Sequence, residues 1–193
     1  LVLVVVSRGS IFCEYLKLYP EFSVTGINNP DYAHTNTAYS LWLARREMTG
    51  NFLYLNGDVL FHPELIRRLV AAPSCNPLAV ERKRCGDEEV KVLLSGTRII
   101  SIGKEIPPTE AYGEFIGVAR FDGSIGSLFG ATLTDVVERD RLLKNYFETA
   151  VDRLLDQAVF TALDISDLPC IGIDFPEDLE RAENTILPAF TGC

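Results

Sequence analysis

The order of apolar and polar residues along the chain predicts short strands that alternate with helices. The first six residues, Leu-Val-Leu-Val-Val-Val, are all aliphatic and predict a strand buried on both faces, as in a parallel sheet. Strands are expected at 1–6, 22–28, 51–55, 78–81, 90–94, 98–102, 115–121, 160–165 and 170–173, and helices at 11–18, 38–45, 63–72, 124–138, 146–157 and 176–187. This order favours an α/β fold with a mixed, mainly parallel sheet flanked by helices.

The strands expected between 78 and 121 interrupt this alternation. Four short strands follow one another there without a helix between them, which indicates a mixed or antiparallel insertion on one side of the sheet. No internal repeat, low-complexity tract or linker divides the sequence. We therefore expect a single domain, residues 1–193.

Polar residues and prolines mark the expected beginnings of several helices. Thr35 or Asn36 is expected to cap the helix at 38–45, because both side chains offer an oxygen to a free backbone N–H. Pro63 and Pro176 suit the first turns of two further helices. Trp42 lies on the strongly apolar helix at 38–45 and is expected in the core.

Composition and charge narrow the class of protein. Hydrophobic residues make up 47% of the chain and charged residues 23%, the balance of a soluble globular protein. No apolar run approaches the roughly 20 residues that span a bilayer. The 27 acidic residues outnumber the 18 basic ones, giving a net charge of −9. Such a chain repels nucleic acid, and a polyanionic substrate would need a local basic patch or a divalent cation.

Cysteine and histidine usage argues against two kinds of metal site. The five cysteines are widely scattered and form no C-x-x-C pair, so neither a disulfide framework nor a structural zinc site is expected. The two histidines are too few for a histidine-rich site. A reducing cytoplasm is the expected location.

Two aspartates follow apolar strands in positions that favour ligand binding. Asp58 comes after the strand 51–55 and Asp174 after the strand 170–173, and open α/β sheets bind ligands beyond the carboxyl ends of strands. Two carboxylates in one crevice suit Mg²⁺, which takes one or two carboxylates together with substrate phosphates. Two structural alternatives stay open: Asp58 can serve the turn after Asn-Gly, and Asp174 can help to cap the last helix. Phe175, at the expected N-cap, has no side-chain oxygen to offer.

Other polar residues are weaker candidates when taken alone. Lys104 follows the strand 98–102 and could reach a phosphate, although a solvated turn pair with Glu105 is the alternative. Tyr146 and Glu148 begin a helix, where the helix dipole favours a carboxylate. Glu114 precedes a strand. An acidic residue near aromatic rings could hold a cationic head group.

The ordered segments 29–33, 35–45, 52–59, 90–92, 103–106, 113–117 and 173–180 together resemble one enzyme family. They include Asn-Pro-Asp-Tyr-Ala at 29–33, Leu-Asn-Gly-Asp-Val at 55–59 and Gly-Glu-Phe-Ile-Gly at 113–117. The family is that of the nucleotidyltransferases, which includes phosphocholine cytidylyltransferases and related sugar-phosphate nucleotidyltransferases. The resemblance covers essentially the whole chain.

The resemblance implies a Rossmann-like nucleotidyltransferase fold. It also implies an enzyme that transfers a nucleotidyl group from an NTP, expected to be CTP, to a small phosphorylated or phosphonate acceptor and releases pyrophosphate. It implies that Asp58 and Asp174 hold Mg²⁺ and act in catalysis together with Lys104. It also places Asn36 and Tyr39 near the nucleotide. Lys104, Glu114, Tyr146 and Glu148 are the residues that it implies would face the acceptor.

The sequence departs from the family pattern at its start. Family members begin with a strand and a Gly-rich, Arg-containing loop that cradles the triphosphate, and the chain has no such loop. The strand at 1–6 resembles the family's second strand, so we expect that roughly 50–60 residues are missing before it. The alternative function is therefore a non-catalytic nucleotide-binding or regulatory module. A glycosyltransferase ranks lower, because Asn56-Gly57-Asp58 lacks the second carboxylate of a D-x-D pair. A missing first strand would leave a sheet edge that favours self-association.

Overall fold

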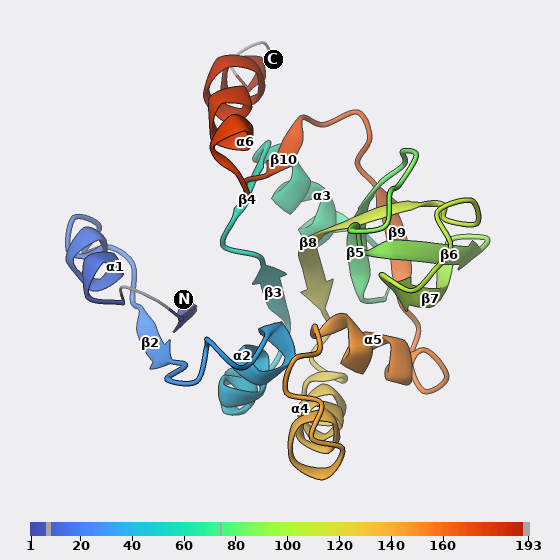
Figure 1. Ribbon diagram of the computed structural model, residues 1–193, viewed down its shortest axis with the longest axis horizontal. Coiled ribbons are helices and arrows are strands. Elements are labelled where there is room, and N and C mark those ends of the chain that lie inside the picture. Colours follow the sequence, from blue (N-terminus) through green and yellow to red (C-terminus); the bar gives the residue numbers. More distant parts are fainter. Residues whose placement is uncertain (7–8, 74, 191–193) are drawn as a thin grey trace. The chain divides into compact units, whose positions relative to one another are not determined.

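The computed structural model describes residues 1–6, 9–73 and 75–190, without the side chains of Ser10 and Cys13. The described residues form two compact units (Figure 1). The first consists of residues 1–50 and 123–154, and the second of residues 51–122 and the described residues from Leu155 onward. The expectation of a single domain stays a prediction.

The first unit combines a small parallel sheet with helices. Strand β1 (Val2–Val5) pairs in parallel with β2 (Thr25–Asn28), as the aliphatic run at the start of the chain predicts. Its helical elements are α1 (Gly9–Leu16), α2 (Thr37–Leu43), η1 (Arg45–Glu47), α4 (Gly126–Thr134), η2 (Asp135–Arg139) and α5 (Glu148–Leu154). The buried rings of Phe129 on α4 and Phe147 before α5 meet edge to face, 6.4 Å apart, and form the centre of this unit.

The second unit is built on a six-stranded sheet with the strand order β3-β8-β5-β9-β7-β6. Its strands are β3 (Phe52–Leu55), β5 (Pro77–Glu81), β6 (Lys91–Ser95), β7 (Arg98–Gly103), β8 (Gly113–Phe121) and β9 (Thr161–Asp164). Helix α3 (Glu64–Ala71) buries Leu65 and Leu69 against Ala79, Val118 and Ile165 of this unit. The two leucines lie four residues apart, on one face of the helix.

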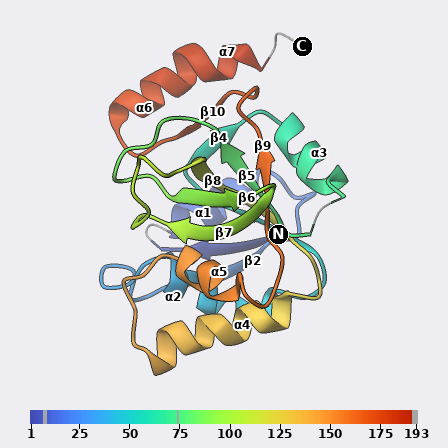
Figure 2. The same ribbon diagram turned by 90° about the vertical axis from the view of Figure 1, so that its right-hand side faces the viewer.

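A second, two-stranded sheet pairs β4 (Val59–Phe61) with β10 (Cys170–Gly172). Three helical elements follow β10 as one continuous coil (Figure 2), namely α6 (Pro176–Arg181), η3 (Ala182–Ile186) and α7 (Leu187–Ala189). The sequence did not indicate β4, because three residues are too short for an alternation of apolar and polar positions to show. This short strand determines where Asp58 lies.

The mixed α/β class expected from the sequence is confirmed, but the share of parallel pairing is lower than expected. Only β1–β2 and β5–β9 pair in parallel among the described strands, and the other pairings are antiparallel. The reason is the insertion that the short strands predicted. The turn between β6 and β7 contains Gly96 at φ +63°, and the nine residues of β8 run antiparallel to β3, β5 and β6.

No helix in the described ranges is both long and apolar enough to cross a membrane. Cys75, Cys85 and Cys170 are free thiols. Cys193 and the side chain of Cys13 lie outside the described part of the chain.

A completely buried lysine holds the loop before β6. The Lys91 ammonium donates to the backbone carbonyls of Gly86, Asp87 and Glu89, at 3.0–3.1 Å, and its side chain has no exposed surface. In turn the Glu89 carboxylate accepts from the backbone N–H of Gly86 at 2.9 Å. A buried charge is tolerated when hydrogen bonds surround it, so Lys91 is a structural residue.

We expect Lys91→Met to lower the free energy of unfolding by about 2–4 kcal/mol, because three backbone carbonyls lose their charged donor. Urea unfolding followed by circular dichroism measures the change. Lys144→Met is the control, because Lys144 is exposed and forms no ion pair within the described chain. A loss below about 0.5 kcal/mol for Lys91→Met, the range of ordinary surface substitutions, would show that the loop does not depend on this ammonium.

Candidate functional site

Pairing of β4 with β10 brings the two predicted metal-binding segments together. Val59 lies opposite Gly172, and the backbone carbonyl of Asp58 accepts from the N–H of Ile173 at 2.8 Å. Asp174 is the next residue after Ile173. Since paired strands lie about 5 Å apart, Asp58 and Asp174 come from neighbouring ends of one two-stranded sheet.

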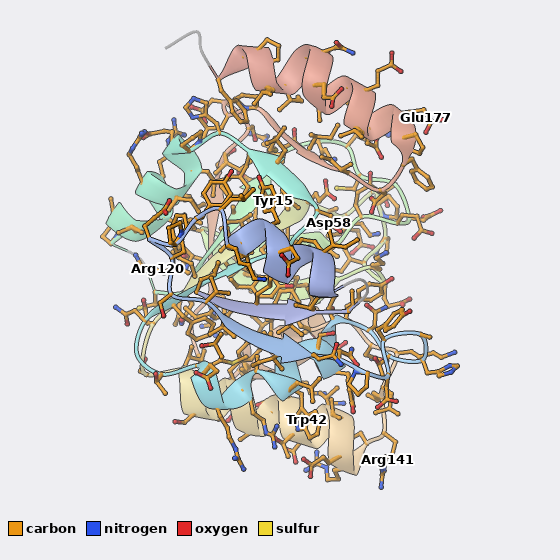
Figure 3. All side chains as sticks on the ribbon, turned by 90° about the vertical axis from the view of Figure 1, so that its left-hand side faces the viewer. Tyr15, Trp42, Asp58, Arg120, Arg141 and Glu177 are labelled. Atoms are coloured by element: carbon orange, nitrogen blue, oxygen red, sulfur yellow. The ribbon has the colours of Figure 1, made fainter. Side chains whose placement is uncertain are left out.

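Both carboxylates are exposed and without a hydrogen bond or ion pair to any described residue (Asp58 is labelled in Figure 3). The Asp58 carboxylate therefore does not serve the turn after Asn56-Gly57. Asp174 does not cap the last helix either, because the Asp178 carboxylate accepts from the backbone N–H groups of Asp174 and Phe175, at 3.2 and 3.0 Å. The structural alternatives for both residues are thus not used in the fold.

The donor set suits a hard divalent cation. Carboxylate oxygens are the ligands that Mg²⁺ prefers, and two of them with substrate phosphates and water complete its coordination. Within the described ranges no three residues among histidine, cysteine, aspartate and glutamate gather into a metal site. A metal here would therefore need ligands from the substrate, and the assignment of Asp58 and Asp174 as its ligands stays a prediction.

Cys170 begins β10 in the same two-stranded sheet, and its surroundings disfavour the thiolate form. Burial, with the nearby carboxylates of Glu81 and Glu114, raises the pKa of the Cys170 thiol to about 11. Nucleophilic chemistry needs the thiolate, which is scarce at neutral pH for such a group.

Glu114, predicted to face the acceptor, lies in an ion pair inside the second unit. It stands opposite Glu81 across the β5–β8 pair, and like charges in this position repel each other. The Lys83 ammonium lies 2.5 Å from Glu114 and 3.5 Å from Glu81 and compensates both. Burial raises the pKa of Glu114, and the bond to Lys83 offsets this in part. For Lys83, burial lowers the pKa, but the ion pairs prevail and keep the pKa above its ordinary value.

Lys104 follows β7, as expected. Its ammonium lies 3.3 Å from the carboxylate of Glu88, whose side chain is 94% exposed. An exposed ion pair of this kind contributes little to stability. Its role in catalysis stays a prediction.

The residues predicted near the nucleotide lie in the first unit. Asn36 caps α2, since its Oδ1 accepts from the N–H of Thr37 at 2.8 Å, which confirms the expected start of the helix. The Tyr39 hydroxyl donates to the Asp31 carboxylate at 3.2 Å. Burial raises the pKa of the Tyr39 hydroxyl. The hydrogen bond to Asp31 and the negative charge of that carboxylate raise it further.

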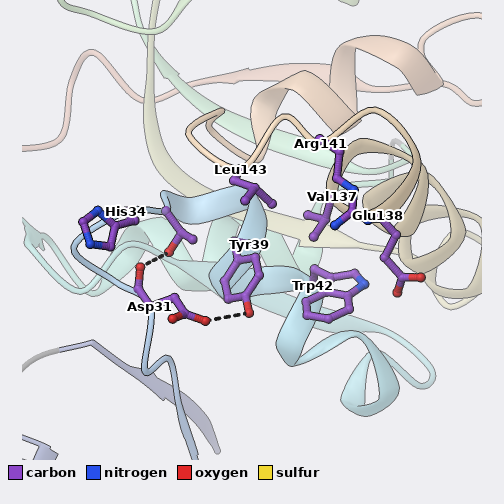
Figure 4. Close-up of a pocket in the computed structure, with 9 residues that line it drawn as sticks. Asp31, His34, Tyr39, Trp42, Val137, Glu138, Arg141 and Leu143 are labelled. Carbon is purple, nitrogen blue, oxygen red and sulfur yellow. Dashed lines mark hydrogen bonds between the residues drawn. The ribbon is translucent and has the colours of Figure 1, made fainter.

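Tyr39 lines a cavity of about 380 Å³ (Figure 4). Its lining combines aromatic, aliphatic and charged side chains: Asp31, His34, Thr35, Tyr39, Trp42, Val137, Glu138, Arg141 and Leu143. The Tyr39 and Trp42 rings lie 5.2 Å apart and tilted, and the Arg45 guanidinium stacks on Trp42 at 4.3 Å. An aromatic wall with a charged rim can bind a planar polar molecule.

Trp42 was expected in the core, and this expectation is wrong. The residue is half-buried and lines the cavity. Ala38, four residues earlier on the same face of α2, is completely buried, whereas Trp42 lies further along the helix and is only half-buried. An apolar helix of this length gives no sequence signal for which of its aromatic residues faces solvent.

Tyr146 and Glu148 also belong to the first unit. Tyr146 is 40% exposed, whereas Glu148 is buried in the first turn of α5. The backbone N–H of Phe147, between them, donates to the hydroxyl of Thr37 at 3.0 Å, which ties the start of α5 to the start of α2. Their contact with an acceptor stays a prediction.

Comparison with known sequences identifies transferases. No family model matches the chain. The chain is 27% identical over 200 residues to the bifunctional IPC transferase and DIPP synthase of Rubrobacter xylanophilus, covering 97% of the chain and 41% of the relative. It is 36% identical over 189 residues to the CMP-5'-(3-aminopropyl)phosphonate synthase of Streptomyces rubellomurinus, covering 88% of the chain and 28% of the relative. The chain thus spans less than half the length of both.

Solved structures agree on the fold. The inositol-1-phosphate CTP transferase from T. maritima matches with a TM-score of 0.74 at 20% identity, over 92% of the chain and 71% of that structure. The CTP:phosphocholine cytidylyltransferase LicC from Streptococcus pneumoniae matches with a TM-score of 0.76 at 16% identity, over 95% and 76%. The chain has the nucleotidyltransferase fold, and the resemblance that the sequence motifs carry is confirmed.

The ion-pair cluster makes a stability prediction. We expect Lys83→Met to lower the free energy of unfolding by about 1–2 kcal/mol at pH 7, because Glu81 and Glu114 then face each other without their shared cation. Burial already raises the Glu114 pKa above its ordinary value, so protonation relieves this repulsion as the pH falls. The loss should therefore be smaller at pH 4.5 than at pH 7, as urea unfolding at both pH values would show.

The matched control for this experiment is Lys17→Met. Lys17 pairs with Glu14 at 2.6 Å, but both side chains are about 70% exposed, so the change should stay within about 0.5 kcal/mol. An equal loss for Lys83→Met at both pH values would refute the proposed role of the carboxylate pair.

Proposed function

We propose that the chain takes part in Mg²⁺-dependent transfer of a cytidylyl group from CTP to a small phosphorylated or phosphonate acceptor. The observation that carries the proposal is the pair of exposed carboxylates of Asp58 and Asp174, which have no partner among the described residues, at the joined ends of β4 and β10. The names of the similar proteins support the substrate class. They describe CTP transfer to inositol-1-phosphate and phosphocholine and the synthesis of a CMP-linked aminopropylphosphonate.

In this reaction an oxygen of the acceptor's phosphate or phosphonate attacks the α-phosphorus of CTP. A new P–O bond forms, the bond to the β-phosphate oxygen breaks, and pyrophosphate leaves with the electron pair. The chain's contribution is to bind and orient two anions against their mutual repulsion. A divalent cation held by Asp58 and Asp174 would supply the positive charge that a chain of net charge −9 lacks.

Lys104 in the second unit and the cavity in the first unit are two further candidate binding elements, each proposed on its own contacts. The Lys104 ammonium would bind a phosphate oxygen as a point charge. The cavity beside Tyr39 and Trp42 would receive the planar base of the nucleotide, in line with the implied position of Tyr39. Glu114, Tyr146 and Glu148 are proposed to contact the acceptor.

The alternative is a nucleotide-binding module without turnover. Titration calorimetry with Mg²⁺ and CTP, beside an assay of pyrophosphate release with phosphocholine or 3-aminopropylphosphonate, separates the two functions. Binding of CTP with release of pyrophosphate supports the transferase. Binding without release favours the module, and no binding contradicts both.

We expect Asp58→Asn to weaken Mn²⁺ binding in the presence of CTP at least about tenfold, because a carboxylate ligand becomes a neutral amide. Electron paramagnetic resonance of free Mn²⁺ measures the affinity. The thermal midpoint should stay near that of the unmodified protein, since the side chain is exposed and unpartnered. Asp156→Asn, another exposed aspartate of the second unit, is the control. Unchanged Mn²⁺ affinity in Asp58→Asn would remove the metal assignment.

Fluorescence of Trp42 can test whether the nucleotide binds in the cavity beside Tyr39. Trp42 is the single tryptophan of the sequence, so the intrinsic fluorescence reports on this cavity. We expect Mg²⁺ and CTP to change the Trp42 emission saturably, with the same midpoint as in calorimetry. CTP that binds in the calorimeter but leaves the emission unchanged would place the nucleotide elsewhere.

A further inference from the structure

We propose that Asn56 carries a fixed hydrogen-bond donor for a phosphoryl oxygen of the substrate, oriented by Tyr54 and given room by Gly117. This inference rests on the proposed function, because it assumes that phosphoryl groups bind beside Asp58. It adds a substrate-contacting amide to the two carboxylates and Lys104. The three residues belong to β3, to the turn that follows it and to β8, all within the second unit.

One hydrogen bond orients the side-chain amide of Asn56, and another holds its backbone. The Tyr54 hydroxyl donates to Oδ1 of Asn56 at 2.5 Å, and the backbone N–H of Asn56 donates to the carbonyl of Gly117 at 2.8 Å. With Oδ1 engaged, the amide presents its Nδ2 hydrogens in another direction. Nδ2 packs against Gly117 and has no acceptor among the described residues, and the side chain is only half-buried, so an acceptor for this donor would come from a ligand or from solvent.

Gly117 makes this position of the amide possible. It is buried in β8 at φ +77°, a backbone conformation that side chains rarely adopt, and the register of β3 with β8 puts it opposite Asn56. A Cβ atom at Gly117 would collide with Cβ, Cγ and Nδ2 of Asn56. The side chain of Asn56 therefore occupies the space that the missing side chain of Gly117 leaves.

The donor lies next to the proposed metal ligand. Gly57 alone separates Asn56 from Asp58, so the amide and the carboxylate belong to one tight turn, and the carbonyl of Asp58 is itself held by Ile173. A phosphoryl oxygen that approaches a cation at Asp58 comes within reach of a donor two residues away. Hydrogen bonds to such a charged oxygen are short and strong. An amide can donate such a hydrogen bond without carrying a charge. An ammonium group in the same place would be attracted by the neighbouring carboxylates, away from the substrate.

The decisive variant is Asn56→Asp. Aspartate keeps the shape of the side chain and the acceptor for the Tyr54 hydroxyl, but it replaces the donor by a negative charge. We expect it to weaken the binding of a phosphoryl ligand at least about tenfold in titration calorimetry. Tyr54→Phe, which removes the hydroxyl that orients the amide, should weaken binding by a smaller factor, about two- to fivefold. Asn184→Asp, the same change at an exposed position on η3, is the control and should bind like the unmodified protein.

Two arms identify which substrate supplies the oxygen. One arm titrates Mg²⁺ with CTP and the other titrates phosphocholine, and the arm that loses affinity in Asn56→Asp names the ligand. The inference is overturned if Asn56→Asp has a melting temperature near that of the unmodified protein and binds both ligands with an affinity within twofold of it. This result leaves the proposed function standing. An unmodified protein that binds neither ligand overturns the proposed function and the inference with it. If Asn56→Asp unfolds, Tyr54→Phe decides, and unchanged affinity in that variant overturns the inference.

Discussion

The hydrogen bond from the N–H of Ile173 to the carbonyl of Asp58 is the interaction on which the proposed site depends. It extends the three-residue pairing of β4 with β10 by one step and joins two segments that are far apart in the sequence. Because the bond uses only backbone atoms, it leaves the carboxylates of Asp58 and Asp174 free. The capping of α6 by Asp178 serves the same end, since it satisfies the backbone at Asp174 without using the Asp174 side chain.

The charged groups of the second unit differ in whether the fold supplies them with a partner. Glu81, Glu114 and Lys83 neutralise one another across β5 and β8, and the buried Lys91 is satisfied by backbone carbonyls. These groups stabilise the sheet. Asp58 and Asp174 have no such partner among the described residues. A carboxylate that folding leaves uncompensated, in a chain of net negative charge, is the better candidate for binding an external cation.

Much of the fold could be predicted from local pattern. The aliphatic run at the start of the chain forms β1, Asn36 caps α2, and Pro176 begins α6, because each of these depends on neighbouring residues alone. The mixed sheet followed from the short strands between 78 and 121, although antiparallel pairing is more extensive than expected. The pairing partners themselves depend on contacts between distant residues, which a local pattern does not contain.

The sequence pointed to the two carboxylates of the candidate site. It did not predict the residues that surround them. Asp58 and Asp174 follow apolar strands, and that position alone pointed to them. The ion pair of Lys83 with Glu114 requires the register of β5 against β8, and the opening at Gly117 for Asn56 requires that of β3 against β8. For Trp42, hydrophobicity indicated burial, whereas the residue is only half-buried and lines the cavity beside Tyr39.

The most direct test of the central claim is anomalous diffraction from crystals of this protein grown with Mn²⁺ and CTP. A manganese peak bonded to oxygens of both Asp58 and Asp174, at about 2.2 Å and together with phosphate oxygens of the nucleotide, is the predicted result. A peak bound elsewhere, or carboxylates too far apart to share one ion, would contradict the claim that β4 and β10 join to form a cation site.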